Sequence, residues 1–141
     1  MHVSHQRIGQ MVWADFIARP VLADGTLLQQ IQNRSVTGAS IRPYSVYKAL
    51  EESDVYDGAI SAKLDGGLSG DSLLRELILD DVRRTADLFR HIFDKSNGVD
   101  GWVVVPVSPL KTFDHTILKK AIITLQLLAV KLHLIFMMKQ I

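Results

Sequence analysis

Val99-Asp-Gly-Trp-Val-Val-Val-Pro-Val-Ser-Pro-Leu110 carries the strongest indication of the fold of this chain. It follows the turn residues Asn97-Gly98, runs through the apolar residues Trp102 to Val105, and breaks at Pro106. A short β-branched run between turn residues is typical of a strand buried on both faces, and such strands belong to parallel sheets covered by helices. If the sheet is a barrel, the residues after the strand face the reacting end, so chemistry is expected at the corner Val103–Pro109.

The composition is that of an ordinary globular domain, and the length suits one domain over residues 1–141. Sixteen basic residues against 15 acidic ones give a net charge of +1, which offers no electrostatic case for a nucleic-acid partner. The absence of cysteine excludes disulfides and thiolate chemistry and is compatible with a cytoplasmic location, which we expect. The N-terminal residues lack the apolar core of a signal peptide.

Predicted strands and helices alternate along the chain, which implies right-handed parallel crossovers and an α/β fold. In residues 71–95 an apolar stripe recurs at helical spacing, as one helix or as two with a break near Asp80. Pairs four residues apart, Asp80 with Arg84 and Asp87 with His91, are expected on its exposed side. The predicted elements are a strand over 11–17, a helix over 27–33 capped by Thr26, a strand over 35–41, helices over 43–50 and 55–64, the helical segment 71–95, the Trp102 strand, a helix over 116–130 and a strand over 131–138.

Four segments share a pattern with one enzyme family. They are Ile8-Gly-Gln-Met-Val-Trp-Ala-Asp-Phe-Ile17, Ser53-Asp-Val-Tyr-Asp57, Leu79-Asp-Asp-Val-Arg-Arg-Thr-Ala-Asp-Leu88 and Asp100-Gly-Trp-Val-Val-Val-Pro-Val-Ser-Pro109. These segments, and their spacing over residues 7 to 110, resemble the N-terminal portion of transaldolases of the bacterial and plastid type.

The resemblance implies a partial (β/α)8 TIM barrel, comprising about the first four strands and an extra helical insert. Members of this family move a dihydroxyacetone unit between sugar phosphates in the pentose phosphate pathway, through a lysine Schiff base. They need no metal and no cofactor. A sugar phosphate is therefore the expected substrate.

The resemblance also implies roles for particular residues. Asp15 matches the first-strand acid that moves protons, and Lys139 matches the amine that attacks the ketose carbonyl. A desolvated, partly neutral amine suits that attack, and a barrel interior can supply one. Thr37 and Ser108 are expected to bind substrate. Arg42, which departs from the family pattern, is also a substrate-binding candidate: it would hold phosphate or, alternatively, lie at the surface.

The chain departs from the family pattern at two site positions. Pro106 stands where the family has a third-strand Glu, and Arg42-Pro43 stands where it has Asn-Pro. The match also ends at the fourth strand, which would leave an open sheet edge. A second hypothesis is therefore a non-catalytic remnant that acts through self-association or through a complementary partner half.

The apolar run over residues 121–138 has a third interpretation. Its length of about 18 residues is close to the minimum for spanning a membrane. Lys131 would lie well inside the span, where a charge is costly, so membrane insertion is not expected. We expect a helix and a strand that barrel elements would normally cover.

Overall fold

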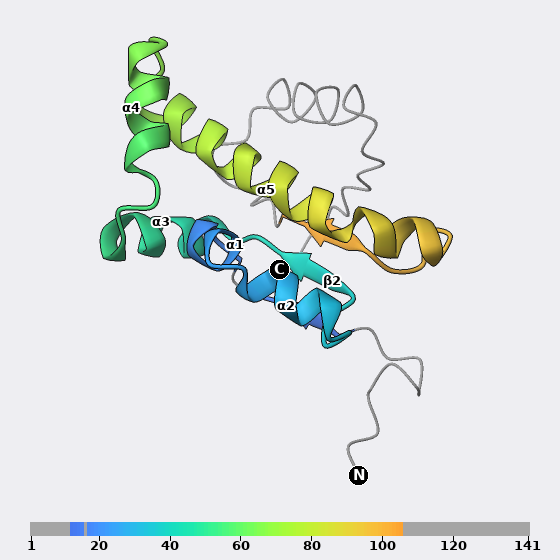
Figure 1. The fold of residues 1–141 in the computed structure, drawn as a ribbon. Helices are drawn as coiled ribbons and strands as arrows, with labels where there is room; N and C mark the ends of the chain where they lie inside the picture. The colour runs from blue at the N-terminus through green and yellow to red at the C-terminus, as the bar shows by residue number, and fades with distance from the viewer. Residues whose placement is uncertain (1–11, 16, 106–141) are drawn as a thin grey trace, which may run out of the picture.

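A parallel three-stranded sheet in the order β1-β2-β3 lies at the centre of the fold, and helices connect its strands (Figure 1). The structure is a computed structural model that describes residues 12–15 and 17–105. Its elements are β1 (Trp13–Ala14), α1 (Arg19–Ala23), α2 (Thr26–Gln32), β2 (Gly38–Ser40), α3 (Pro43–Glu52), α4 (Asp57–Asp65), α5 (Gly70–Lys95) and β3 (Trp102–Val104). The α/β prediction is confirmed.

The register of the strands assigns residues to the two faces of the sheet. Ala39 pairs with Val103, and both side chains are buried in the core beneath the helices. The neighbouring position, Gly38, pairs with Trp13 on one side and with Trp102 on the other. Because successive strand residues point to opposite faces, Gly38 belongs to the face opposite to that of Ala39 and Val103.

Gly38 leaves room for the Trp13 side chain against β2. A Cβ atom at this position would lie 2.9 Å from the carbonyl oxygen of Trp102 and 3.0 Å from Cε2 of Trp13. The Trp13 indole therefore occupies the space that any side chain at position 38 would need.

Helix α5 is one continuous helix of 26 residues, without a break near Asp80. Its buried stripe packs toward β3, α1, α2 and α4, and Figure 1 shows α5 running beside the sheet with α4 at its amino end. The predicted i, i+4 ion pairs are not the ones that form. Asp80 instead pairs with Arg83 at 2.9 Å, and Asp87 pairs with Arg90 at 3.2 Å, so both partners lie three residues along.

Three local predictions need correction. Helix α1 was not predicted, because five residues are too few to show a periodic pattern. Gly25, with a positive φ of 81°, is the N-cap of α2, whereas Thr26 is its first helical residue. The β3 strand is not fully buried on both faces within the described residues, since Trp102 and Val104 are half-buried.

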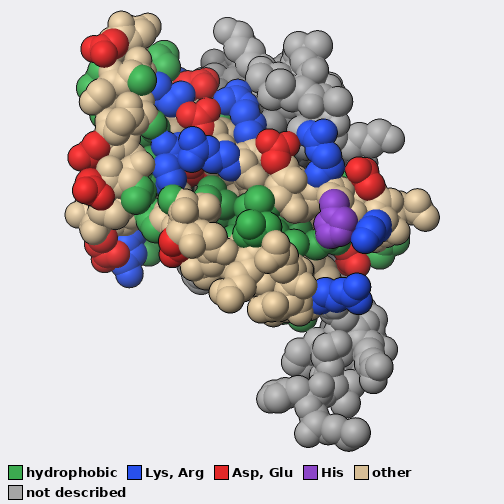
Figure 2. All heavy atoms as spheres, in the orientation of Figure 1, with side chains coloured by type: hydrophobic (Ala, Val, Ile, Leu, Met, Phe, Trp, Pro, Cys, Tyr) green, Lys and Arg blue, Asp and Glu red, His purple; other side chains and the backbone are tan. Residues whose placement is uncertain are grey.

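The outer surface carries no large field of one charge on the face drawn in Figure 2, where basic and acidic side chains are interspersed. Among the helices of the described residues, none combines the length and apolar character that crossing a membrane requires. The apolar run over 121–138 lies outside the described residues, so both predictions for it stay predictions.

Candidate functional site

Asp15 lies directly after β1 and forms a small polar cluster with two residues from the end of β2. The Arg42 guanidinium contacts both carboxylate oxygens, with Nη2 3.1 Å from Oδ2 and Nε 3.2 Å from Oδ1. The Ser40 hydroxyl donates a hydrogen bond to Oδ1. The cluster is open to solvent, because the Asp15 and Arg42 side chains are 39% and 50% exposed.

Backbone pairing at the carboxyl ends of the strands fixes this cluster. The amide of Ile17 donates to the carbonyl of Ser40 over 3.1 Å, and the amide of Ile41 donates to the carbonyl of Val104 over 2.9 Å. Pro43 then begins α3, because its fixed φ suits the first turn of a helix. Asp15 and Arg42 are therefore held at the edge where parallel α/β folds place their ligands.

Thr37 lies at the opposite end of β2 from Asp15. Its side-chain oxygen accepts a hydrogen bond from the Val12 amide at 3.2 Å and donates one to the Val12 carbonyl at 3.3 Å. Thr37 is also buried. The geometry assigns it to strand pairing, and its predicted contact with substrate stays a prediction.

Two of the predicted site residues, Lys139 and Ser108, lie outside the described residues, as does Pro106. Their roles stay predictions. The structure thus brings together Asp15 and Arg42 of the predicted set and adds Ser40. Sequence reasoning missed Ser40, although its place at the end of the second strand was a usable signal.

A buried polar cluster next to the site was also missed. Arg19 donates from Nε to Oδ1 of Asp81 over 2.8 Å, and the Tyr56 hydroxyl donates to Oδ2 of the same carboxylate over 2.6 Å. The Tyr56 hydroxyl in turn accepts from the Arg19 amide at 3.0 Å, and the guanidinium lies 4.5 Å from the Tyr56 ring centroid. All three side chains are buried.

Burial dominates the electrostatics of this cluster. It raises the pKa of the Tyr56 hydroxyl, and the hydrogen bond to the Asp81 carboxylate raises it further. Burial also raises the pKa of Asp81, against the opposing effect of the hydrogen bonds from Tyr56 and Arg19. A buried cluster of this kind is held together only while every member keeps its partner.

The buried cluster gives a structural role to two of the segments that resemble transaldolase. Tyr56 belongs to the segment Ser53–Asp57 and Asp81 to the segment Leu79–Leu88. Both converge on Arg19, which begins α1 four residues after Asp15. These segments therefore anchor the chain that leaves β1 and so position Asp15, while contributing no group to the cluster around it.

We predict that Tyr56→Phe changes how stability depends on pH. Above the ordinary tyrosine pKa of about 10, the unfolded chain loses the phenolic proton while the folded chain keeps it. The Tyr56 contribution to the free energy of unfolding therefore falls as pH rises, by at most about 1.4 kcal/mol per pH unit. Urea denaturation between pH 9 and pH 11 should show a shallower decline in Tyr56→Phe.

The matched control is Tyr47→Phe, whose side chain is exposed. It should decline as steeply as the unmodified chain. If the free energy of unfolding fell equally steeply with pH in all three proteins, the claim that the fold protects the Tyr56 hydroxyl would be contradicted.

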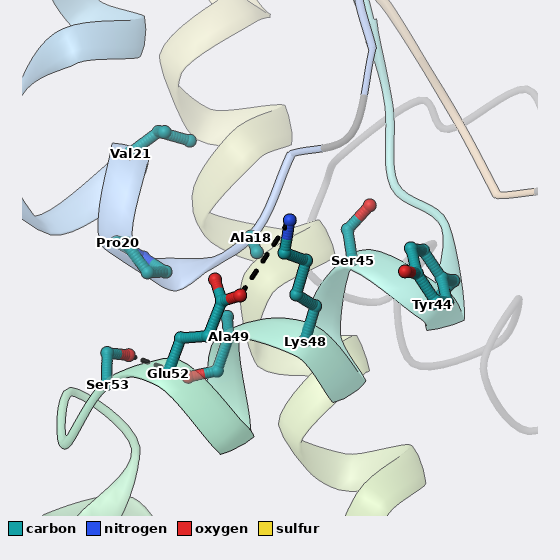
Figure 3. A pocket seen from close by; sticks show the side chains of 9 residues that line it. All are labelled: Ala18, Pro20, Val21, Tyr44, Ser45, Lys48, Ala49, Glu52 and Ser53. Atoms are coloured by element: carbon teal, nitrogen blue, oxygen red, sulfur yellow. Dashed lines mark hydrogen bonds and ion pairs between the residues drawn. The ribbon is translucent and has the colours of Figure 1, made fainter.

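A pocket of about 580 Å³ lies between α1 and α3, on a part of the surface that does not include the Asp15 cluster. Its walls combine apolar groups of Ala18, Pro20 and Val21 with polar groups of α3. Figure 3 shows Lys48 directed toward Ala18 and paired with Glu52, at 3.8 Å. This pocket has no assigned role in the Asp15 site. Within residues 12–15 and 17–105 there is also no group of three or more side chains suited to hold a metal ion.

These features define a class: a parallel α/β protein with an acidic group at the carboxyl edge of its sheet. No protein-family model matches the chain. Curated proteins do match it. Transaldolase of Thermobifida fusca is 37% identical over 101 residues, and transaldolase of Mycolicibacterium smegmatis is 34% identical over 106. Transaldolase 2 of Nostoc punctiforme is 28% identical over 109 residues.

These alignments identify the chain as transaldolase-like, and the resemblance predicted from its sequence is confirmed. They cover 72%, 75% and 77% of this chain. They cover only 27%, 29% and 29% of the respective relatives, so the chain spans less than a third of the length of the proteins that it matches.

Proposed function

We propose that the chain takes part in transaldolase chemistry, moving a dihydroxyacetone unit between sugar phosphates through a lysine Schiff base. The observation that carries the proposal is the position of Asp15 directly after β1, at the carboxyl edge of a parallel sheet. There the Ser40 hydroxyl donates a hydrogen bond to the carboxylate and orients it. A proton-transfer group has to be within hydrogen-bond reach of the reacting atoms. The exposure of Asp15 at this edge supports the proposal, because a substrate bound there could approach the carboxylate.

In the proposed reaction, the Lys139 amine adds to the ketose carbonyl and water leaves, which forms the imine. Asp15 then accepts the hydroxyl proton, the carbon–carbon bond breaks, and its electron pair passes to the imine, so that an aldose phosphate leaves and the dihydroxyacetone unit stays on Lys139 as an enamine. This enamine would add to the aldehyde of a second aldose phosphate, and hydrolysis of the new imine would release the product and the amine. Residues 1–141 would act as one domain that provides about the first four strands of a TIM barrel with an extra helical insert.

We expect borohydride to trap this imine on the full chain incubated with a ketohexose phosphate. Intact-mass analysis should show a covalent adduct, and peptide mapping should place it on Lys139. Lys139→Arg should abolish the adduct, because a guanidinium cannot form the imine. Lys131→Arg, eight residues earlier in the sequence, is the matched control and should leave the adduct intact.

A non-catalytic protein is the alternative proposal, and two observations favour it. Pro106 cannot replace the third-strand Glu, and the Asp15 carboxylate is already engaged by Arg42. Among the described residues β1 and β3 each have one strand neighbour, β2, so either edge could pair with a second copy or a partner half. No adduct on the unmodified chain, with self-association seen by sedimentation, would support this alternative.

A further inference from the structure

The ion pair between Asp15 and Arg42 joins the residue proposed to move protons to a cation that can bind an anion. Nη2 and Nε of Arg42 each contact a different oxygen of the carboxylate. This two-point geometry is the one by which guanidinium groups also bind phosphate. A phosphate monoester carries more negative charge than a carboxylate and offers the same pair of acceptor oxygens.

Because both side chains are exposed to solvent, another anion can replace Asp15 as the partner of Arg42. The Arg42 side chain is half exposed and that of Asp15 more than a third exposed, and ion pairs in this setting are held weakly. Ser40 also donates to the Asp15 carboxylate. Asp15 would therefore remain oriented after Arg42 had moved to another anion.

The backbone that carries Arg42 is fixed, so the exchange needs only a movement of its side chain. Ile41 is fully buried and its amide is bonded to Val104. Arg42 itself is the N-cap of α3, whose first turn contains no acidic residue. The positive end of the helix therefore adds to the field of the guanidinium at this edge.

We propose that substrate phosphate controls the Asp15 carboxylate through Arg42. A phosphate group of the substrate binds the Arg42 guanidinium in place of Asp15 and so releases the carboxylate. The inference rests on the proposed function and adds a specificity role to it. Sugar phosphates would free Asp15, whereas sugars without a phosphate would leave it paired. The Arg that stands at position 42 in place of the family's Asn would then serve to bind the substrate phosphate.

The test is a titration of the full chain with inorganic phosphate at constant ionic strength, followed by NMR of the arginine Nε–H signals. We expect the Arg42 signal to shift on binding. Arg42→Ala should weaken phosphate binding by about tenfold or more, since a two-point charged contact is lost. Asp15→Asn should strengthen it by about threefold or more, because the competing carboxylate is removed.

Arg90 and Asp87 provide the matched control, since they form another exposed pair at 3.2 Å. Arg90→Ala and Asp87→Asn should leave phosphate binding unchanged. The proposed exchange is contradicted if Arg42→Ala binds phosphate as well as the unmodified chain does. It is also contradicted if Asp15→Asn binds phosphate no more tightly than the unmodified chain. Because phosphate binding needs no imine, failure of borohydride trapping would contradict the proposed reaction and leave this result standing.

Discussion

Asp81→Ala should lower the free energy of unfolding by about 3–5 kcal/mol, the range for removing one partner of a buried ion pair. Arg19 would keep a longer ion-pair contact, of 4.0 Å, to the partly exposed Asp80. In the folded chain the Arg19 guanidinium is 4% exposed, and its short contact to Asp81 is 2.8 Å. The substitution would also leave the Tyr56 hydroxyl without the carboxylate to which it donates. Urea denaturation at pH 7 measures the loss.

Asp87→Ala on the same helix is the control, because Asp87 is exposed and pairs only near the surface with Arg90. It should change stability by no more than about 0.5 kcal/mol. If Asp81→Ala does not fold, Asp81→Asn keeps the shape of the side chain and should still cost more than the control. Equal effects at positions 81 and 87 would show that the buried cluster does not stabilise the fold.

Gly101→Ala should be comparably damaging, because Gly101 combines a left-handed backbone with close contact to α5. Its φ is +85°, and an added Cβ would lie 2.6 Å from the backbone nitrogen of Phe93 and 2.8 Å from its Cα. Its amide also pairs β3 with β2 by donating to Thr37 over 2.7 Å. Relief of the overlap requires a shift of α5 or β3, so we expect a loss of about 3–5 kcal/mol.

Gly67→Ala separates the two causes. Gly67 has the same φ of +85°, but a Cβ there would have no neighbour within 4 Å. The control therefore reports the backbone penalty alone, about 1–2 kcal/mol. If both substitutions cost the same, the packing of β3 against α5 is looser than the structure indicates.

Local pattern was sufficient to predict much of the fold. The apolar stripe over residues 71–95 predicted α5, and the short β-branched run at Trp102 predicted β3. What local pattern could not reveal was the burial of Asp81. It stands beside the partly exposed Asp80 in the sequence, and its burial depends on Arg19, which lies 62 residues away.

The candidate site was predictable to the same extent. The resemblance placed Asp15 at the end of the first strand, where the structure has it, because the position follows from the spacing of a short segment. Its pairing with Arg42 could not be foreseen, since it depends on the register between β1 and β2 and on the start of α3. Position 42 was recognised as a departure from the family, but its partner was not.

Strands β1, β2 and β3 run parallel in a register that brings Asp15 beside the end of β2. NMR detection of couplings across hydrogen bonds tests it most directly. We expect a coupling from the Ile17 amide to the Ser40 carbonyl and another from the Ile41 amide to the Val104 carbonyl. Couplings from these amides to other carbonyls, or their rapid exchange with solvent in the folded chain, would contradict it.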